Sequence, residues 1–280
     1  MKKNRHQQFI SFLLLAWVLP TMVQAAKDEQ VWNTVLKNQF FAGKTIHESN
    51  DIITLDVPYR AEDPAMVPLR ITSKIPQSAE RFIKKITLFI DKNPYPFAGE
   101  FEFTPANGQA DLALRVRVNT YSYIRAVAEL NDGQLYMVKK FVKASGGCSA
   151  PIGADLDAAM QRLGKMKFRL DGGVHKGKPT RVQLLISHPN ITGMQMDQVS
   201  RIIRPSNFIE KVQVFFDNQP ILTAKTDIAI SADPNFRFYF VPKKSGELRA
   251  EFTDTSCESP TSRAVCKPGK SYSKTFDVRL

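Results

Sequence analysis

Cysteine and histidine are both scarce in this sequence. Three cysteines and four histidines occur among 280 residues. Three cysteines are too few for a fold stapled by disulfides, and their odd number leaves at least one thiol without a disulfide partner in the chain. The histidines stand in no recognisable nucleophile motif, so no catalytic triad or metal centre is predicted. The chain has enough hydrophobic residues to form a large core: 43% of the residues are hydrophobic and 19 are Phe, which excludes disorder of the whole chain.

Only one apolar run approaches the length of a membrane span. It covers residues 9–23, follows three basic residues within the first five positions, and is interrupted by Pro20. A bilayer requires about 20 apolar residues, so this run is more typical of an export signal. We expect cleavage after Ala25 and a periplasmic mature chain that does not insert into a membrane. An uncleaved membrane anchor is the alternative.

The chain is basic. Its 39 Lys and Arg residues exceed its 27 Asp and Glu residues by 12, and removing residues 1–25 with their three positive charges would leave +9. The basic residues form scattered pairs at 84–85, 139–140 and 243–244, without the interleaved aromatic residues of a nucleic-acid surface. We therefore predict no nucleic-acid partner, and keep open a basic face for an anionic ligand or an acidic protein.

One helix and many strands are expected. Apolar residues recur at helical spacing between Lys27 and Phe41. From Ile52 onward, short β-branched or alternating runs separated by turn residues indicate antiparallel sandwiches. The first set of predicted strands covers 52–57, 67–72, 84–91, 99–104, 110–118, 123–130 and 135–142. The second set covers 166–170, 181–187, 211–217, 236–242, 246–253 and 271–280. The pattern predicts an all-β protein with two sandwiches.

A segment of small residues separates the two sets of strands. Residues 144–154 read ASGGCSAPIGA, and a short helix is expected over 155–163. Within this segment Cys148 has no neighbouring side chain larger than Ala to pack around its sulfur, so we expect an exposed thiol. Gly146 and Gly147 would give the arm flexibility and let its backbone enter a narrow cleft of a partner. No base or cation that would activate the thiol is recognisable nearby in the sequence.

The other two cysteines lie close together near the C-terminus. Cys257 and Cys266 are separated by eight residues between two predicted strands. In an oxidising compartment this spacing suits a disulfide, which would add about 2–3 kcal/mol of stability. A pair of metal ligands is the alternative, but no further Cys or His lies beside them to complete a zinc set.

Several motifs resemble a known family. The stretch from Ile52 to Cys148 resembles SoxY, the sulfur-binding subunit of the SoxYZ carrier of bacterial thiosulfate oxidation. The elements that carry this resemblance are Leu55 through Pro58, KNPYP at 92–96, GQLY at 133–136 and Gly146-Gly147-Cys148. The stretch from Lys165 to Leu280 resembles SoxZ, through LLISHP at 184–189, ISADPNFRFYF at 230–240 and GELRAEFTD at 246–254. The fused arrangement is similar to single-chain carriers associated with quinoprotein dehydrogenases.

The resemblance implies a fold, a site and partners. It implies immunoglobulin-like sandwiches over 26–143 and 165–280, paired within one chain and joined by a cysteine-bearing arm at 144–164. It also implies that Cys148 holds sulfur intermediates as covalent adducts, with no other cofactor. The partners would be periplasmic sulfur-oxidising enzymes and a c-type cytochrome, or a quinoprotein dehydrogenase system. Because the arm is tethered at both ends, its tip would protrude by less than ~20 Å.

Three functions are compatible with these features. The first is a covalent sulfur carrier that is not itself an enzyme. The second is a non-covalent accessory protein of a periplasmic quinoprotein (PQQ) dehydrogenase or its cytochrome, with Cys148 incidental or redox-sensing. The third is a thiol peroxidase, which the absence of a visible base or resolving cysteine disfavours. The sequence favours the carrier.

Overall fold

The computed structural model describes residues 29–151, 156–198, 200–256 and 270–280. The chain divides into two compact units, Met1–Lys44 and Thr45–Leu280. In the first unit a helix runs over residues 29–41; it contains the π-helical turn η1 (Trp32–Leu36) and α3 (Lys37–Phe41). This confirms the predicted N-terminal helix. Among the described residues, no helix is long and apolar enough to span a membrane.

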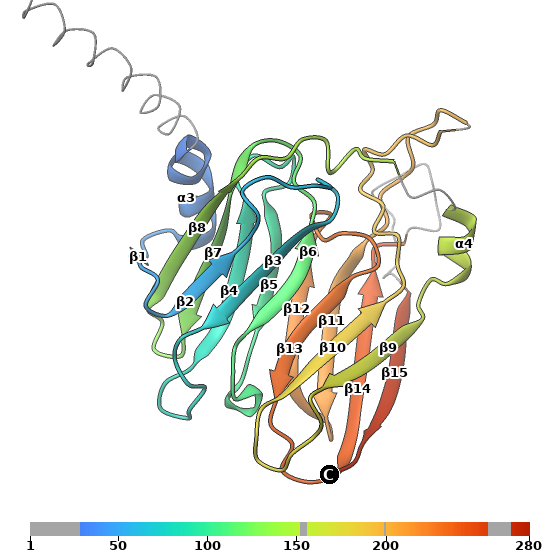
Figure 1. Ribbon diagram of the computed structural model, residues 1–280. Helices are drawn as coiled ribbons and strands as arrows, with labels where there is room; N and C mark the ends of the chain where they lie inside the picture. Colours follow the sequence, from blue (N-terminus) through green and yellow to red (C-terminus); the bar gives the residue numbers. More distant parts are fainter. Residues whose placement is uncertain (1–28, 152–155, 199, 257–269) are drawn as a thin grey trace, which may run out of the picture. The chain divides into compact units, whose positions relative to one another are not determined.

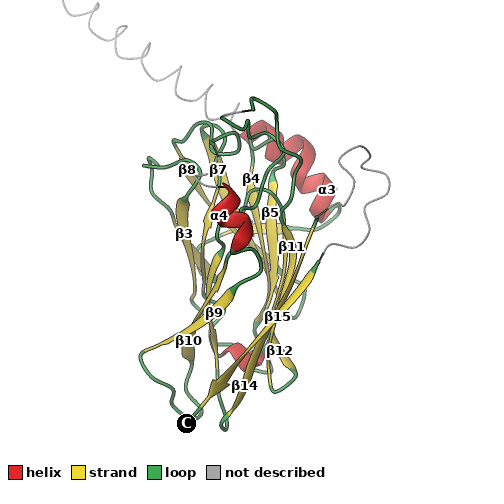
Figure 2. Ribbon diagram, turned by 90° about the vertical axis from the view of Figure 1, so that its right-hand side faces the viewer, coloured by secondary structure: helices red, strands yellow, loops and turns green. Residues whose placement is uncertain are grey.

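The second unit consists of two β-sheets that face each other (Figures 1 and 2). The nine-stranded sheet has, in spatial order, β1 (Ile46–Glu48), β8 (Leu135–Val142), β7 (Ser122–Leu130), β4 (Ile83–Ile90), β5 (Phe97–Glu102), β12 (Gln219–Thr226), β11 (Ile209–Phe216), β14 (Gly246–Asp254) and β15 (Ser271–Val278). The six-stranded sheet has β2 (Ile53–Asp56), β3 (Val67–Ser73), β6 (Leu112–Val116), β13 (Asn235–Phe240), β10 (Thr180–Ile186) and β9 (Met166–Asp171). The strand pairs are antiparallel except for β1 with β8. The all-β prediction is confirmed.

Alternating side chains build the core between the sheets. In β3, Val67, Leu69 and Ile71 are buried while the residues between them face outward. In β13, Phe236, Phe238 and Phe240 are fully buried. Burying one such side chain contributes about 1.5–3 kcal/mol, so these rows explain why the period-2 runs of the sequence become strands.

The second unit has a first half, strands β1–β8, and a second half, strands β9–β15, and both sheets contain strands of both halves. Strand β5 of the first half pairs with β12 of the second half from Gly99↔Thr226 to Glu102↔Thr223, and β6 meets β13 at Ala113↔Arg237. In Figure 1 the blue-to-green strands of the first half therefore continue into the yellow-to-red strands of the second. Asn107, which follows β5 in the 3₁₀ turn η2 (Pro105–Asn107), is fully buried at this boundary. Its side-chain amide donates to the carbonyl oxygens of Ile221 (2.8 Å) and Tyr239 (2.7 Å), both in the second half. The halves are therefore joined by strand pairing and by this side chain.

Most predicted elements are present, and two strands were missed. The expected helix at 155–163 is α4 (Leu156–Gln161), and all thirteen predicted strands are found. The missed strands are the short β1 and β12. The predicted signal at 1–25 and the Cys257–Cys266 pair lie outside the described residues.

Candidate functional site

Cys148 is completely buried, so the prediction of an exposed thiol is wrong for this structure. Its exposed fraction is 0%, and it is the free cysteine of the described residues. The prediction considered only the small side chains beside Cys148 in the sequence. Burial comes instead from residues that are distant in the sequence and belong to both halves of the sandwich.

The first half holds the Gly-Gly-Cys segment through the residues that follow β6. The backbone N–H of Gly147 donates to the carbonyl oxygen of Val118 (3.1 Å), and that of Gly146 to the carbonyl oxygen of Asn119 (2.8 Å). The N–H of Cys148 donates to the side-chain oxygen of Asn119 at 3.3 Å. This segment is therefore docked along the end of β6.

The second half holds the same segment through the loop between β10 and β11. The hydroxyl of Thr192 donates to the carbonyl oxygen of Cys148 (2.7 Å), and the amide of Gln195 donates to the carbonyl oxygen of Ala150 (3.0 Å). Both side chains are buried, and the Thr192 N–H donates to the Gln195 side-chain oxygen at 3.0 Å. Cys148 thus lies at the junction of the two halves.

The two glycines before Cys148 serve close packing and chain reversal in this structure. A Cβ on Gly147 would lie 2.1 Å from the carbonyl oxygen of Pro64 and 2.6 Å from that of Val118. Gly146 has a φ of +81°, which side chains disfavour, but a Cβ there would meet nothing within 4 Å. The access that Gly146 and Gly147 would give a partner stays a prediction.

Arg117, which sequence reasoning missed, is buried beside this segment. Only 3% of it is exposed, and its Nη2 donates to the carbonyl oxygens of Pro189 (3.4 Å) and Asn190 (3.2 Å). Its Nε has no hydrogen-bond partner within the described residues. No sequence motif distinguishes Arg117 from the other basic residues, of which the chain has 39 Lys and Arg in all. Its burial depends on the pairing of the two halves.

Burial sets the protonation state of this pair of groups. It raises the pKa of the Cys148 thiol to about 11, and the positive charge of Arg117 opposes the rise only in part. Burial also lowers the pKa of Arg117, against the electrostatic influence of Cys148 and Asp63. At neutral pH the site with Cys148 buried, called the closed site below, therefore contains a neutral thiol and a guanidinium cation, and the thiol is a poor nucleophile.

His188 has a structural role beside this site. It is fully buried, with Nε2 3.4 Å from the carboxylate of Asp254 and Nδ1 accepting from the N–H of Asn190 (3.0 Å). Burial raises the pKa of Asp254, but hydrogen bonds from His188 and Ser256 outweigh this effect and leave it lowered. This network orients the turn at 189–190 whose carbonyl oxygens bind Arg117. Within the described residues, no cluster of three or more His, Cys, Asp or Glu side chains could bind a metal ion.

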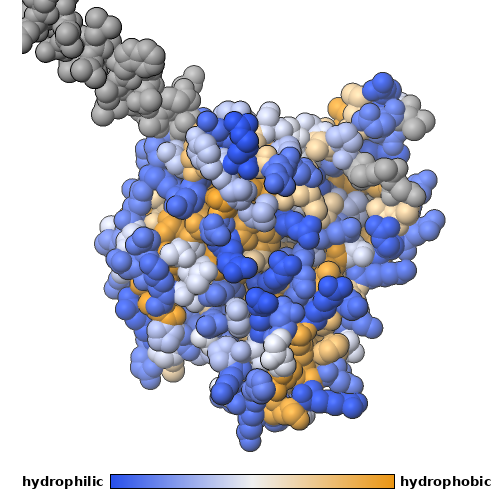
Figure 3. Space-filling view, in the orientation of Figure 1, coloured by the Kyte–Doolittle hydropathy of each residue, from blue (hydrophilic) through white to orange (hydrophobic). Residues whose placement is uncertain are grey.

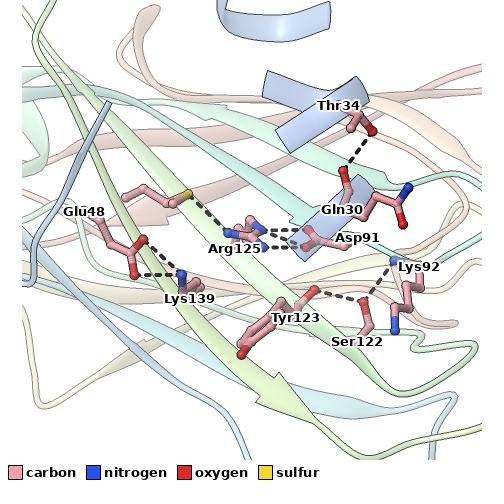
Figure 4. Close-up of polar contacts among 10 residues, drawn as sticks. Gln30, Thr34, Glu48, Asp91, Lys92, Ser122, Tyr123, Arg125 and Lys139 are labelled. Atoms are coloured by element: carbon pink, nitrogen blue, oxygen red, sulfur yellow. Dashed lines mark hydrogen bonds and ion pairs between the residues drawn. The ribbon is translucent and has the colours of Figure 1, made fainter. Parts of the chain in front are cut away.

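A second buried arginine contrasts with Arg117. Arg125 of β7 has no exposed surface and is bound by the carboxylate of Asp91, with Nε at 2.9 and 2.8 Å from the two oxygens and Nη2 at 2.8 Å (Figure 4). Its Nη1 also lies 3.9 Å from the sulfur of Met137. Arg125 thus has its counter-charge within the core, whereas no described carboxylate lies within ion-pair distance of Arg117.

Part of the excess positive charge gathers on the outer face of the six-stranded sheet. The strand register places Asp56, Arg70, Ala113, Arg237, Gln183 and Arg169 in one row across six strands, with three arginines to one aspartate. Arg115 lies in the next row, near the end of β6 that leads to Arg117. Hydrophilic residues cover much of this face in Figure 3, with apolar patches between them. This basic sheet face spans both halves of the molecule.

Comparisons with known proteins identify the class of the chain. The family model of Sulfur oxidation protein SoxY matches residues 37–148, and that of Sulphur oxidation protein SoxZ matches residues 168–265. The fold and these matches define a sulfur-oxidation protein of the carrier class. The chain belongs to the SoxYZ family, with its SoxY and SoxZ domains fused in one polypeptide.

The solved structures that match parts of this chain share little sequence with it. The sulfur carrier protein SoxY from Chlorobium limicola f thiosulfatophilum is 23% identical, with a TM-score of 0.33 over 46% of this chain and 99% of that one. A superoxide reductase (neelaredoxin) from Ignicoccus hospitalis is 18% identical, with a TM-score of 0.30 over 33% and 78%. A β-glycosidase from Bacteroides vulgatus is 10% identical, with a TM-score of 0.25 over 83% and 25%. No curated protein matches the chain.

Proposed function

We propose that this protein carries sulfur intermediates covalently on Cys148 in the bacterial periplasm and presents them to partner enzymes. The observation that carries the proposal is the position of the thiol. The SoxY match ends at Cys148, which is the free cysteine of the described residues and lies where the SoxY and SoxZ domains meet.

The chemistry would be supplied by the partners. In the reaction that the family resemblance implies, Cys–S⁻ and S₂O₃²⁻ join to form Cys–S–SSO₃⁻ and release two electrons to a c-type cytochrome. Hydrolysis with one water then gives Cys–S–S⁻, SO₄²⁻ and two protons. A dehydrogenase would oxidise the remaining sulfane sulfur. This chain would supply the thiol, expose it to the partner enzymes and bury it from solvent between reactions. The protein is therefore proposed as a carrier without catalytic activity of its own.

Loading requires the closed segment to open. Five hydrogen bonds hold the backbone of 146–150 to Val118, Asn119, Thr192 and Gln195. At a net value of about 1 kcal/mol each, they make opening cost a few kcal/mol, which a partner that binds the open form must supply. Exposure to water would return the pKa of the thiol from about 11 toward its ordinary value of 9.0. The thiolate fraction at neutral pH would then rise about a hundredfold.

The basic sheet face would guide partners to this site. Arg70, Arg115, Arg169 and Arg237 have no ion-pair partner among the described residues, so their field extends into solvent. Enzymes that load or unload Cys148 would approach this face with an acidic surface, because opposite potentials accelerate encounter.

A second function is favoured by the burial of Cys148. If the segment never opens, the chain would be a non-covalent accessory protein of a periplasmic quinoprotein dehydrogenase or its cytochrome. Such a protein would bind its partner equally well without the thiol.

Intact mass spectrometry of the protein from periplasm separates these functions. The carrier predicts a reducible increment on wild type, about 32 Da for one sulfur atom or about 112 Da for a thiosulfonate. The increment should be absent from Cys148→Ser and present in the control Ser149→Ala. An unmodified thiol in cells supplied with sulfur substrate, with partner binding intact in Cys148→Ser, would reject the carrier in favour of the accessory role.

A further inference from the structure

Arg117 is a buried cation that has no carboxylate within ion-pair distance among the described residues; the charge of Asp63 acts on it only from farther away. The described residues within hydrogen-bond distance of its guanidinium are the neutral carbonyl groups of Pro189 and Asn190. Removing a guanidinium from water costs several kcal/mol unless an anion compensates it. The core of this protein contains a compensated example, Arg125 with Asp91. An anion is therefore expected to bind beside Arg117 at some stage of the protein's function.

The free donor of Arg117 belongs to the same junction as the thiol. Arg117 immediately precedes Val118 and Asn119, which bind the Gly-Gly-Cys segment. Its Nη2 binds the turn at 189–190, two residues before Thr192, which binds Cys148. The Nε atom is buried and has no partner in the described part of the chain. A guanidinium presents several N–H donors in one plane, which suits the oxygens of a sulfonate group.

We infer that Arg117 and Cys148 together form an anion subsite, in which the guanidinium binds the negatively charged sulfur group carried by Cys148 when the segment is closed. The inference rests on the proposed carrier function, whose cargo would be a thiosulfonate (Cys–S–SSO₃⁻) or a persulfide anion (Cys–S–S⁻), and it adds the cation that binds this cargo. The unloaded thiol is neutral and leaves the guanidinium without an ion-pair partner among the described residues. A loaded, anionic Cys148 cancels the buried charge, so loading and closure stabilise each other.

Two thiol reagents isolate the effect of the negative charge. Tetrathionate loads an anion: Cys–S⁻ attacks a central sulfur, Cys–S–SSO₃⁻ forms and S₂O₃²⁻ leaves. Methyl methanethiosulfonate loads a neutral group: Cys–S⁻ displaces CH₃SO₂⁻ and forms Cys–S–SCH₃. Loading of Cys148 in the full-length protein is verified by mass. The melting temperatures of the two loaded forms are then compared in wild type, in Arg117→Gln and in the control Arg81→Gln, which removes an exposed arginine outside the site.

The subsite predicts that the anionic form melts several degrees above the neutral form in wild type and in Arg81→Gln. In Arg117→Gln the order should be reversed, because a buried sulfonate then lacks its cation. Equal differences in wild type and Arg117→Gln would overturn the inference. So would a Cys148 that accepts the methyl reagent but not tetrathionate, or that accepts neither.

If Arg117→Gln does not fold, amide hydrogen exchange on the wild-type protein tests whether the site prefers an anionic adduct. The anionic adduct should keep the amides of Gly146 and Cys148 protected, and the neutral adduct should lose that protection. Equal protection would overturn the subsite. The carrier function is tested separately by the mass of the periplasmic protein, so adducts found in cells without any preference of the site for anions would reject the subsite alone.

Discussion

The hydroxyl of Thr192 donates a 2.7 Å hydrogen bond to the carbonyl oxygen of Cys148, and this bond joins the SoxZ half to the segment that carries the thiol. In a carrier made of two separate chains, such a bond would depend on their association. In this fused chain both partners belong to one molecule, so the effective concentration of the second half is set by the linker. The bond makes closure of the site a property that the second domain controls.

Removing this bond should make the thiol more reactive. Thr192→Val keeps the shape of the side chain but loses the donor, so the closed form should lose about 1 kcal/mol relative to the open form. The expected result is a fivefold to tenfold faster reaction of Cys148 with a disulfide reagent in the folded protein, measured by mass mapping of the modified residue. Ser149→Ala removes only a 3.4 Å contact with the carbonyl oxygen of Gly146 and should react at nearly the wild-type rate. An unchanged rate in Thr192→Val would show that the second domain does not control closure.

The raised pKa of Cys148 predicts a loss of stability at alkaline pH. The thiol has a pKa of about 11 in the folded protein and an ordinary value of 9.0, so burial favours its protonated form. The contribution of the buried thiol to the free energy of unfolding is therefore fully present below pH 9 and is lost as the pH rises toward 11. Relative to Cys148→Ser, wild type should lose about 1 kcal/mol of unfolding free energy between pH 8 and pH 10, measured by urea denaturation. The difference between the two proteins would stay constant if the thiol were exposed.

The strands could be predicted from the sequence, because they depend on local signals. Val67, Leu69 and Ile71 alternate with the exposed Pro68 and Arg70, and their burial confirms the strand that this two-residue period predicts. The hairpin turn between β11 and β12 has positive φ angles of 48° at Asp217 and 65° at Asn218, as a type I′ turn requires. Strand β12, which follows at once, was missed because its sequence QPILTAKT has Pro220 at its second position and does not alternate cleanly.

The closed site could not be predicted, because it depends on how the two halves pair. Strand β12 is the strand that joins the halves in the larger sheet, and without it the sequence suggests two separate sandwiches. Arg117, Asn119, Thr192 and Gln195 carry no motif, and only the shared sheets bring them around Cys148. A cysteine among glycines therefore suggested an exposed arm, whereas long-range contacts bury it.

The two glycines before Cys148 offer a matched pair of substitutions. In Gly147→Ala the new Cβ would lie 2.1 Å from the backbone oxygen of Pro64 and 2.6 Å from that of Val118, so the segment must move away from both. In Gly146→Ala the Cβ meets nothing within 4 Å, and the cost is only the backbone strain of a φ of +81°. We expect Gly147→Ala to lose about 1–3 kcal/mol of stability and to increase the reactivity of Cys148 more than Gly146→Ala does. Equal reactivity in both variants, measured with the same disulfide reagent, would contradict the close packing of this segment.

The boundary between the halves should also be a major source of stability. Asn107→Ala removes the amide that binds the carbonyl oxygens of Ile221 and Tyr239, and leaves two buried acceptors without this donor. The expected loss of unfolding free energy is about 2–4 kcal/mol by urea denaturation, because each unsatisfied buried group costs about 1–3 kcal/mol. Asn131→Ala is the control, since the Asn131 side chain makes two hydrogen bonds, with the N–H of Phe82 and the carbonyl oxygen of Glu80, but is exposed and lies within the first half. The Asn107 side chain makes a third bond, in which its oxygen accepts from the N–H of Thr104. If the shared sheets fold as one cooperative unit, Asn107→Ala should keep a single transition at lower urea concentration, whereas two separate transitions would show that the halves unfold independently.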